Sequence, residues 1–236
     1  MKNQPIILLQ LLLVLCLACV HTRCWAVKNE DILRLNEKER QTLLRLARDT
    51  VTGYLEKGSL PDMHSYYLSP TLQKNLGVFV TLKEKGTGAL RGCIGYIIGR
   101  KPLAESVVDC SVFAATRDRR FSPLKRGEQD TVHIEISVLS PPRLITSIDE
   151  ILLGTHGLII TKGPYSGVLL PQVAVEQGWN RNAFLEAVCR KAGLPAEAWR
   201  EKGTMLSVFK AQVFSEPSAH NSADTEKARK ENLSRR

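Results

Sequence analysis

Residues 90–95 have the sequence LRGCIG, which combines a cation, a thiol and two glycines. In a β-strand, Arg91, Cys93 and Gly95 would share one face, with the guanidinium and the thiol roughly 6–7 Å apart. A neighbouring cation favours the thiolate, the reactive form of cysteine. The segment therefore predicts that Cys93 is a nucleophile or a ligand-contacting thiol. The alternative is a small buried cysteine beside a surface charge.

Two glycines in one strand indicate close approach by a ligand or by another backbone. The functional interpretation assigns substrate contacts to Arg91, Gly92 and Gly95. Residues 117–120, of sequence RDRR, supply a second cluster of charge. There Arg120 and Arg91 would together hold a carboxylate or phosphate. Asp118 is a candidate catalytic residue that would orient an arginine. The alternative is that these cations only stabilise the end of a preceding helix.

Three further residues are candidates for the same site. His156 lies between two glycines and could act as an acid or base, since imidazole titrates near neutral pH. A plain loop histidine fits the same pattern. Gln172 and Glu176 are candidates for lining a substrate cleft, although Glu176 could equally cap a helix. The cysteines show neither zinc-ligand spacing nor a CxxC pair, so the sequence predicts no structural metal. It also has no GxGxxG after a strand, no Walker loop and no HExxH, and it predicts no cofactor.

The composition narrows the class of protein. The chain has 236 residues, 43% of them hydrophobic, and a net charge of +9, which suits one large domain or two small ones. Collagen, low-complexity disorder, a small disulfide scaffold and a polytopic membrane protein are excluded. Residues 91–126 hold eight bases and three acids, which predicts a small anionic ligand or a solvated basic face. Nucleic-acid binding is disfavoured because no reader motif or interleaved aromatics occur.

The two ends of the chain differ from its body. Residues 1–26 carry Lys2 and an apolar run over 6–20, which predicts a signal peptide cleaved after Ala26 or an uncleaved anchor. We therefore expect a periplasmic or secreted protein, or one that touches a membrane only through this leader. The body spans 27–215, and the charged segment 216–236 is predicted to be disordered. Cys93, Cys110 and Cys189 would remain after cleavage, and an odd number leaves at least one unpaired.

Periodicity predicts the same run of elements twice, a hairpin followed by a helix and a strand. An Asn36–Glu39 capping box begins a first helix that would end at Gly53. The other expected elements are strands at 78–82 and 90–98, a helix opened by Pro102, and strands at 132–138, 158–161 and 168–170, then a helix at 182–192 and a strand at 206–214. This order predicts an α+β fold of mostly antiparallel sheet with helices, in which two subdomains of repeated strand–helix units meet at a cleft.

The LRGCIG segment resembles the signature of the AMMECR family, also called AmmeMemoRadiSam system protein A. Further similar stretches follow in order, namely DxRFxPL from Asp118, ExSVLSP from Glu135, HGL from His156 and SGVLLPQVA from Ser166. The resemblance covers about residues 36–215 and implies that LRGCIG faces a cleft between two subdomains. It also implies association with Memo-like and radical-SAM proteins. By the same resemblance, other members of the family are expected to be cytosolic. It does not assign a reaction, so an enzyme acting on a small anionic substrate and a non-catalytic adaptor for a protein partner both remain open.

Overall fold

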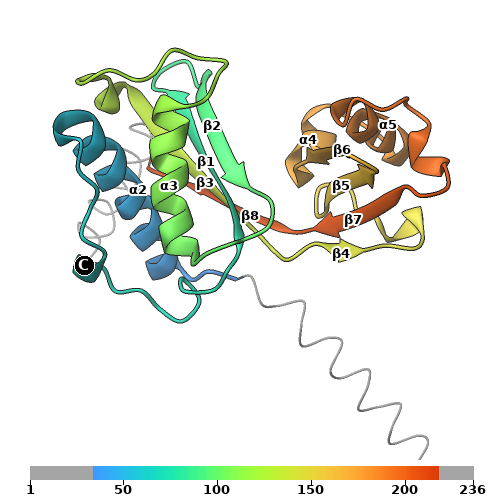
Figure 1. The fold of residues 1–236 in the computed structure, drawn as a ribbon, viewed down its shortest axis with the longest axis horizontal. Coiled ribbons are helices and arrows are strands. Elements are labelled where there is room, and N and C mark those ends of the chain that lie inside the picture. The colour runs from blue at the N-terminus through green and yellow to red at the C-terminus, as the bar shows by residue number, and fades with distance from the viewer. Residues whose placement is uncertain (1–33, 218–236) are drawn as a thin grey trace, which may run out of the picture. The chain divides into compact units, whose positions relative to one another are not determined.

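The fold is α+β and consists of four α-helices and two four-stranded antiparallel sheets within the described residues (Figure 1). The structure is a computed structural model that describes residues 34–217. The predicted leader (1–26) and nearly all of the predicted tail (216–236) lie outside these residues. No helix between residues 34 and 217 is long and apolar enough to cross a membrane.

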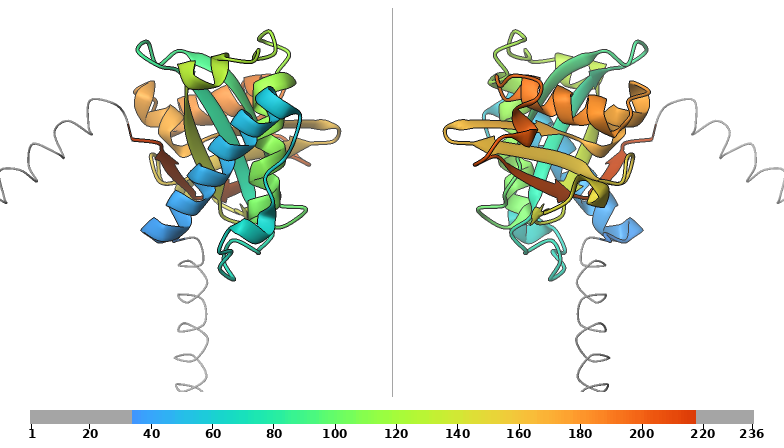
Figure 2. Two further views of the ribbon diagram at one scale, coloured as in Figure 1. Left: turned by 90° about the vertical axis from the view of Figure 1, so that its left-hand side faces the viewer. Right: turned by 90° about the vertical axis from the view of Figure 1, so that its right-hand side faces the viewer.

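The first sheet has the strand order β2-β1-β3-β8. Its strands are β1 (Gly77–Glu84), β2 (Leu90–Tyr96), β3 (Val132–Leu139) and β8 (Ala211–Ser215). Val78, Val80 and Leu82 alternate along β1 and are fully buried. Helices α2 (Glu37–Lys57) and α3 (Leu103–Thr116) lie side by side against this sheet (Figure 2, left). The predicted hairpin, helix and strand are thus confirmed.

The ends of the two helices refine the sequence prediction. The capping box of α2 is present, because Asn36 Oδ1 accepts from the Glu39 amide and Glu39 Oε2 accepts from the Asn36 amide. The helix continues through Gly53 and ends at Gly58, whose φ of 65° is left-handed. The predicted end at Gly53 was therefore wrong, since only the later glycine adopts the conformation that terminates a helix. Pro102 is the N-cap of α3, just before its first helical residue.

The second sheet has the strand order β4-β7-β5-β6. Its strands are β4 (Arg143–Leu144), β5 (Gly157–Lys162), β6 (Tyr165–Leu169) and β7 (Met205–Phe209). The short helix α4 (Pro171–Glu176) and helix α5 (Arg181–Lys191) follow β6, and α5 packs on β5 and β6 (Figure 2, right). Leu158, Ile160, Phe184 and Val188 are fully buried in the core between them.

The two halves repeat one pattern and then exchange strands. Each contains a hairpin, a helix and a strand that pairs with the first strand of the hairpin. After β3 the chain adds β4 to the second sheet, and after β7 it adds β8 to the first. The single strand predicted at 206–214 is therefore two strands in two sheets, interrupted at Lys210. At this crossing the Ser140 amide donates to the Lys210 carbonyl at 2.9 Å, and the Lys210 amide donates to Ser140 Oγ at 2.9 Å.

The packed domain extends past the predicted boundary at residue 215. Glu216 forms an ion pair with Arg48 on α2, with Oε2 2.6 Å from Nη2. The Ile134 amide on β3 donates to the same carboxylate at 2.8 Å. Glu216 therefore joins the end of β8 to α2 and β3, and it belongs to the first half rather than to a free tail.

Candidate functional site

Cys93 lies on β2, the edge strand of the first sheet, opposite Thr81 on β1. The Thr81 hydroxyl donates to Cys93 Sγ at 3.3 Å. Glu135 on β3 continues the row beyond Thr81 and forms an ion pair with Lys83, Nζ to Oε2 2.8 Å. Because side chains alternate along a strand, this row faces away from buried Val80 and Leu82. The thiol therefore belongs to a polar, partly exposed face of the sheet.

The close approach predicted at the two glycines is made by the protein itself. A Cβ on Gly92 would come within 2.2 Å of the Ala114 carbonyl oxygen of α3. A Cβ on Gly95 would come within 2.4 Å of two ring atoms of Phe79. Gly92 thus allows β2 to pack directly on α3, and that contact leaves no space for the substrate predicted there. Gly95 allows the Phe79 ring to lie over the strand.

Arg91 does not stand beside the thiol as the alternation predicted. The pairing of β1 with β2 shifts at this point, with Leu82 opposite Gly92 and Lys83 opposite Leu90. Arg91 is left without a partner in a β-bulge, and a bulge re-aims the side chain that it carries. Arg91 Nη1 donates to the Ser122 carbonyl at 2.8 Å, and Nη2 lies 3.9 Å from Glu128 Oε2. Arg91 therefore fastens residues 122–128 to β2.

Arg120 is the cation that the structure places next to Cys93. Asp118 is buried, with 7% of its surface exposed, and its Oδ2 accepts from the Cys93 amide at 2.8 Å. The Arg120 guanidinium donates to both oxygens of Asp118, at 3.0 Å from Nε and 2.7 Å from Nη2. A bidentate pair of this kind fixes the plane of the guanidinium. Asp118 therefore attaches Arg120 to the strand at Cys93.

Electrostatics support a positioning role for Asp118. Its hydrogen bond with Arg120, together with the amides of Cys93 and Arg120, outweighs burial and lowers the pKa of Asp118 to about 2. A carboxylate that holds its proton so weakly and already accepts four hydrogen bonds is a poor general base. The predicted orienting role is consistent with this geometry, whereas direct catalysis by Asp118 is not.

The Arg120 side chain remains 57% exposed despite its bond to Asp118. Arginine has five N–H donors, and two of them serve Asp118. The remaining donors can hold an anion. The surrounding segment adds positive charge, because residues 117–126 contain five bases and one acid. Positive charge is therefore concentrated in the segment that carries Arg120.

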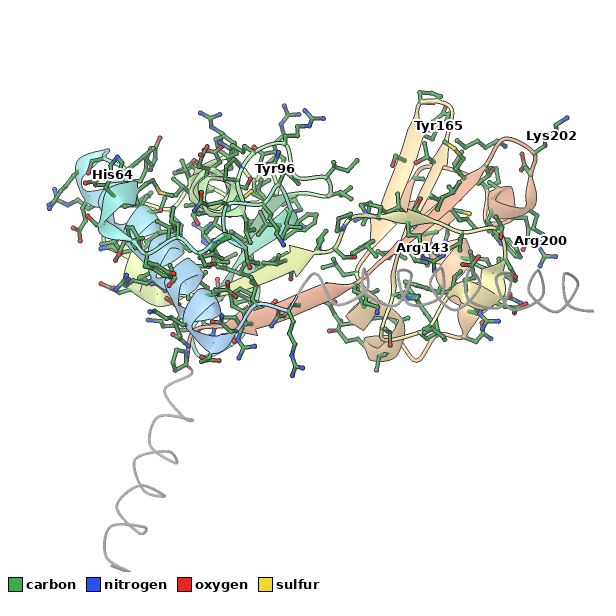
Figure 3. The ribbon with its side chains drawn as sticks, turned by 90° about the horizontal axis from the view of Figure 1, so that it is seen from below. His64, Tyr96, Arg143, Tyr165, Arg200 and Lys202 are labelled. Atoms are coloured by element: carbon green, nitrogen blue, oxygen red, sulfur yellow. The ribbon has the colours of Figure 1, made fainter. Side chains whose placement is uncertain are left out.

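The other predicted site residues belong to the second half. His156 precedes β5, is 7% exposed, and its Nδ1 lies 3.3 Å from the Leu152 amide and 3.1 Å from the Glu150 carbonyl. Gln172 is half-buried in α4 and Glu176 is exposed at its end. Figure 3 labels Tyr96 at the end of β2 and Tyr165 at the start of β6, which mark the two sheets. The structure thus gathers Cys93, Asp118 and Arg120, and places His156, Gln172 and Glu176 on elements of the other half.

Sequence reasoning missed Phe79 and Thr81. Both lie on the exposed side of β1, between the buried positions of that strand. The alternation in the sequence already separates this face from the apolar one. Only the register of the hairpin shows that Thr81 stands opposite Cys93 and Phe79 opposite Gly95.

The cysteines differ sharply in accessibility. Cys110 and Cys189 are fully buried, Cys93 is partly exposed, and all three are free thiols. Burial raises the pKa of Cys110 to about 12, and burial also raises that of Cys189. Both therefore behave as core residues, as their helix stripes predicted. Within residues 34–217 no group of three or more His, Cys, Asp or Glu side chains could hold a metal ion.

The fold and this site define an α+β protein with a thiol and an arginine at one sheet edge. Residues 44–214 match the AMMECR1 family. Protein MK0488 of Methanopyrus kandleri is 41% identical over 190 residues, covering 78% of this chain and 91% of the relative. The crystal structure of PH0010 from Pyrococcus horikoshii is 40% identical, with a TM-score of 0.69, and covers 75% of this chain and 91% of that one. The chain belongs to the AMMECR1 family, and the resemblance found in its sequence is confirmed to that extent.

Proposed function

We propose that the protein binds a small anionic molecule at the edge of β2, with Arg120 as its charged contact and Cys93 as the adjoining thiol. The observation that carries this proposal is the chain of contacts from Arg120 through Asp118 to the Cys93 amide. It holds an exposed guanidinium in a fixed plane and links it to the backbone of Cys93, whose thiol is partly exposed. Thr81 donates a hydrogen bond to the sulfur and so helps to orient the thiol.

This arrangement suits either catalysis or binding alone. As a nucleophile, the Cys93 thiolate would attack an electrophilic carbon of the bound anion, forming an S–C bond as the leaving group departs with its electron pair. As a contact residue, the thiol would only adjoin the ligand. A Cys93→Ser variant separates these roles, because it abolishes turnover in the first case and leaves anion affinity within about threefold in the second.

The test compares alkylation of Cys93 by iodoacetate and by iodoacetamide. In both reactions the thiolate attacks the methylene carbon and displaces iodide, and the reagents differ in the charge of the group they carry. We expect iodoacetate to be favoured at Cys93 by roughly threefold or more relative to a free cysteine. Buried Cys110 and Cys189 are internal standards that should react far more slowly in the folded protein.

Three variants identify the group responsible. Arg119→Gln removes one exposed charge of the same segment and should retain most of the preference for iodoacetate. Arg120→Gln should lose it, and the double variant Asp118→Asn with Arg120→Gln should lose it too without exposing a new carboxylate. An unchanged preference in the double variant, or equal slow labelling of all three cysteines in the wild type, would contradict the proposal.

The association with Memo-like and radical-SAM proteins, and export through the leader, remain predictions from the sequence. Co-purification from the native host tests the first, and the mass of the mature chain tests the second. A stoichiometric protein partner, together with no preference for iodoacetate at Cys93, would favour the adaptor function over the anion site.

A further inference from the structure

An aromatic ring adjoins the thiol on the same face of the first sheet. Phe79 stands opposite Gly95, and two atoms of its ring lie only 2.4 Å from where a Cβ of residue 95 would be. Unlike Val78 and Val80 on either side of it, which are fully buried, Phe79 is partly exposed. One side of the ring rests on the backbone of Gly95. Because Phe79 is partly exposed, part of the ring is open to a further contact.

The ring and the arginine are both tied to β2 within two residues of Cys93. Gly95 and Cys93 are two residues apart on one strand, roughly 7 Å, and share a face. At Cys93 itself, Asp118 links the backbone amide to the Arg120 guanidinium. A small molecule on the order of 7–10 Å long could therefore touch the guanidinium at one end and the ring at the other.

We propose that the ligand of this site joins its anionic group to a flat aromatic group, and that Phe79 is the side chain that contacts that group. This inference rests on the proposed anion site at Arg120. Offset or edge-to-face contact between two rings adds to what area burial alone contributes, and a saturated ring of equal size lacks that gain. Phe79 would thus determine specificity, while Arg120 would supply affinity for any small anion.

The test measures dissociation constants for benzoate, cyclohexanecarboxylate and acetate, by calorimetry or by protection of Cys93 from iodoacetamide. All three carry one carboxylate, and the first two differ chiefly in aromaticity. For the wild type we expect benzoate to bind roughly three- to tenfold more tightly than cyclohexanecarboxylate. Acetate should bind more weakly than both.

Variants assign the preference to one ring. Phe79→Leu should bring benzoate and cyclohexanecarboxylate to within about twofold of each other, whereas Phe79→Tyr should keep the preference. Phe113→Leu is the matched control. The Phe113 ring lies on α3, and its centroid is 4.5 Å from the guanidinium carbon of Arg117. Phe121→Leu tests the ring that lies 5.4 Å from the Arg120 guanidinium.

The outcomes separate this inference from the function on which it rests. Equal binding of benzoate and cyclohexanecarboxylate by the wild type would overturn the aromatic preference and leave the anion site standing. Loss of the preference in Phe121→Leu but not in Phe79→Leu would overturn the role of Phe79. If no carboxylate binds or protects Cys93, the proposed anion site itself is refuted. The wild-type comparison decides the aromatic preference even where a variant fails to fold.

Discussion

The two halves of this protein share a scaffold but not a chemistry. Gly92 on β2 approaches the Ala114 carbonyl of α3, and Gly167 on β6 approaches the Val188 carbonyl of α5. Gly92 stands opposite Leu82 on β1, and Gly167 stands opposite Ile160 on β5. The same strand of each hairpin therefore uses a glycine to seat its helix.

One residue further along each strand the halves diverge. Cys93 follows Gly92 and pairs with Thr81, whereas Val168 follows Gly167 and pairs with Ile159. The segments after the two helices differ in the same way. Residues 117–120 read RDRR and hold Asp118 against the strand, whereas residues 192–195 read AGLP and contain no charge. The repeated pattern supplies the packing, and a few substitutions at one strand edge supply the polar site.

The largest expected effect tests the shared scaffold. Gly92→Ala places a Cβ 2.2 Å from a carbonyl oxygen, and Gly167→Ala places one at 2.6 Å, so strand and helix must separate in both halves. We expect each to lower the free energy of unfolding by about 3 kcal/mol, with Gly92→Ala the more severe. Chemical denaturation measures this, with exposed Ser166→Ala as the control. Near-normal stability of Gly92→Ala would break the proposed equivalence.

A smaller effect tests the buried carboxylate that only the first half has. The pKa of Asp118 is about 2 when folded, below its ordinary 3.8, so its contribution is present above about pH 4 and is lost as the pH falls toward 2. Asp118→Asn should cost about 1–2 kcal/mol at pH 7, and its deficit should shrink near pH 2. Unfolding curves at the two pH values measure the difference.

The control for this pH effect lies in the second half. The hydrogen bond with Arg143, helped by the amides of Thr146 and Ser147, lowers the pKa of Glu150 to about 2 as well. That carboxylate is more exposed than Asp118, at 32% of its side-chain surface against 6%. Glu150→Gln should therefore change stability less than Asp118→Asn. The reverse order would show that burial does not distinguish the two carboxylates.

The smallest effect is expected when the thiol is moved to the other half. Val168→Cys, in a Cys93→Ser background, places a sulfur at the position equivalent to Cys93, where Thr81 and Arg120 have no counterpart. We expect this thiol to show no more preference for iodoacetate over iodoacetamide than free cysteine does. A preference equal to that of Cys93 would mean that the overall charge of the protein, and not the Asp118–Arg120 pair, attracts the anion.

Local patterns predicted much of the fold. The capping box at Asn36, the alternation around Val80 and the turn beside Gly163 act over a few residues, so each can be recognised in the sequence. The order hairpin, helix, strand and its repetition follow from these patterns. The short helix α4 was missed, because six residues carry too little periodicity to separate a helix from a loop.

The candidate site was predicted in part. The residue types around Cys93 and Arg120 predicted an anion site with a thiol, and the structure joins Cys93 to Arg120 through Asp118. The cation beside the thiol, however, is not Arg91, because a bulge redirects that side chain toward Ser122. A bulge depends on the register of two strands, which composition alone does not reveal.

By itself, then, the sequence determined most of the secondary structure, the repeat and the residue types of the candidate site, because caps, turns and periodicity are local properties of the chain. Tertiary structure decided the rest. It split the run at 206–214 between two sheets, and it brought Asp118 to an amide 25 residues away. It also set Phe79 against Gly95. These contacts form only when distant segments pack against one another, and no local pattern encodes which partner each segment will meet.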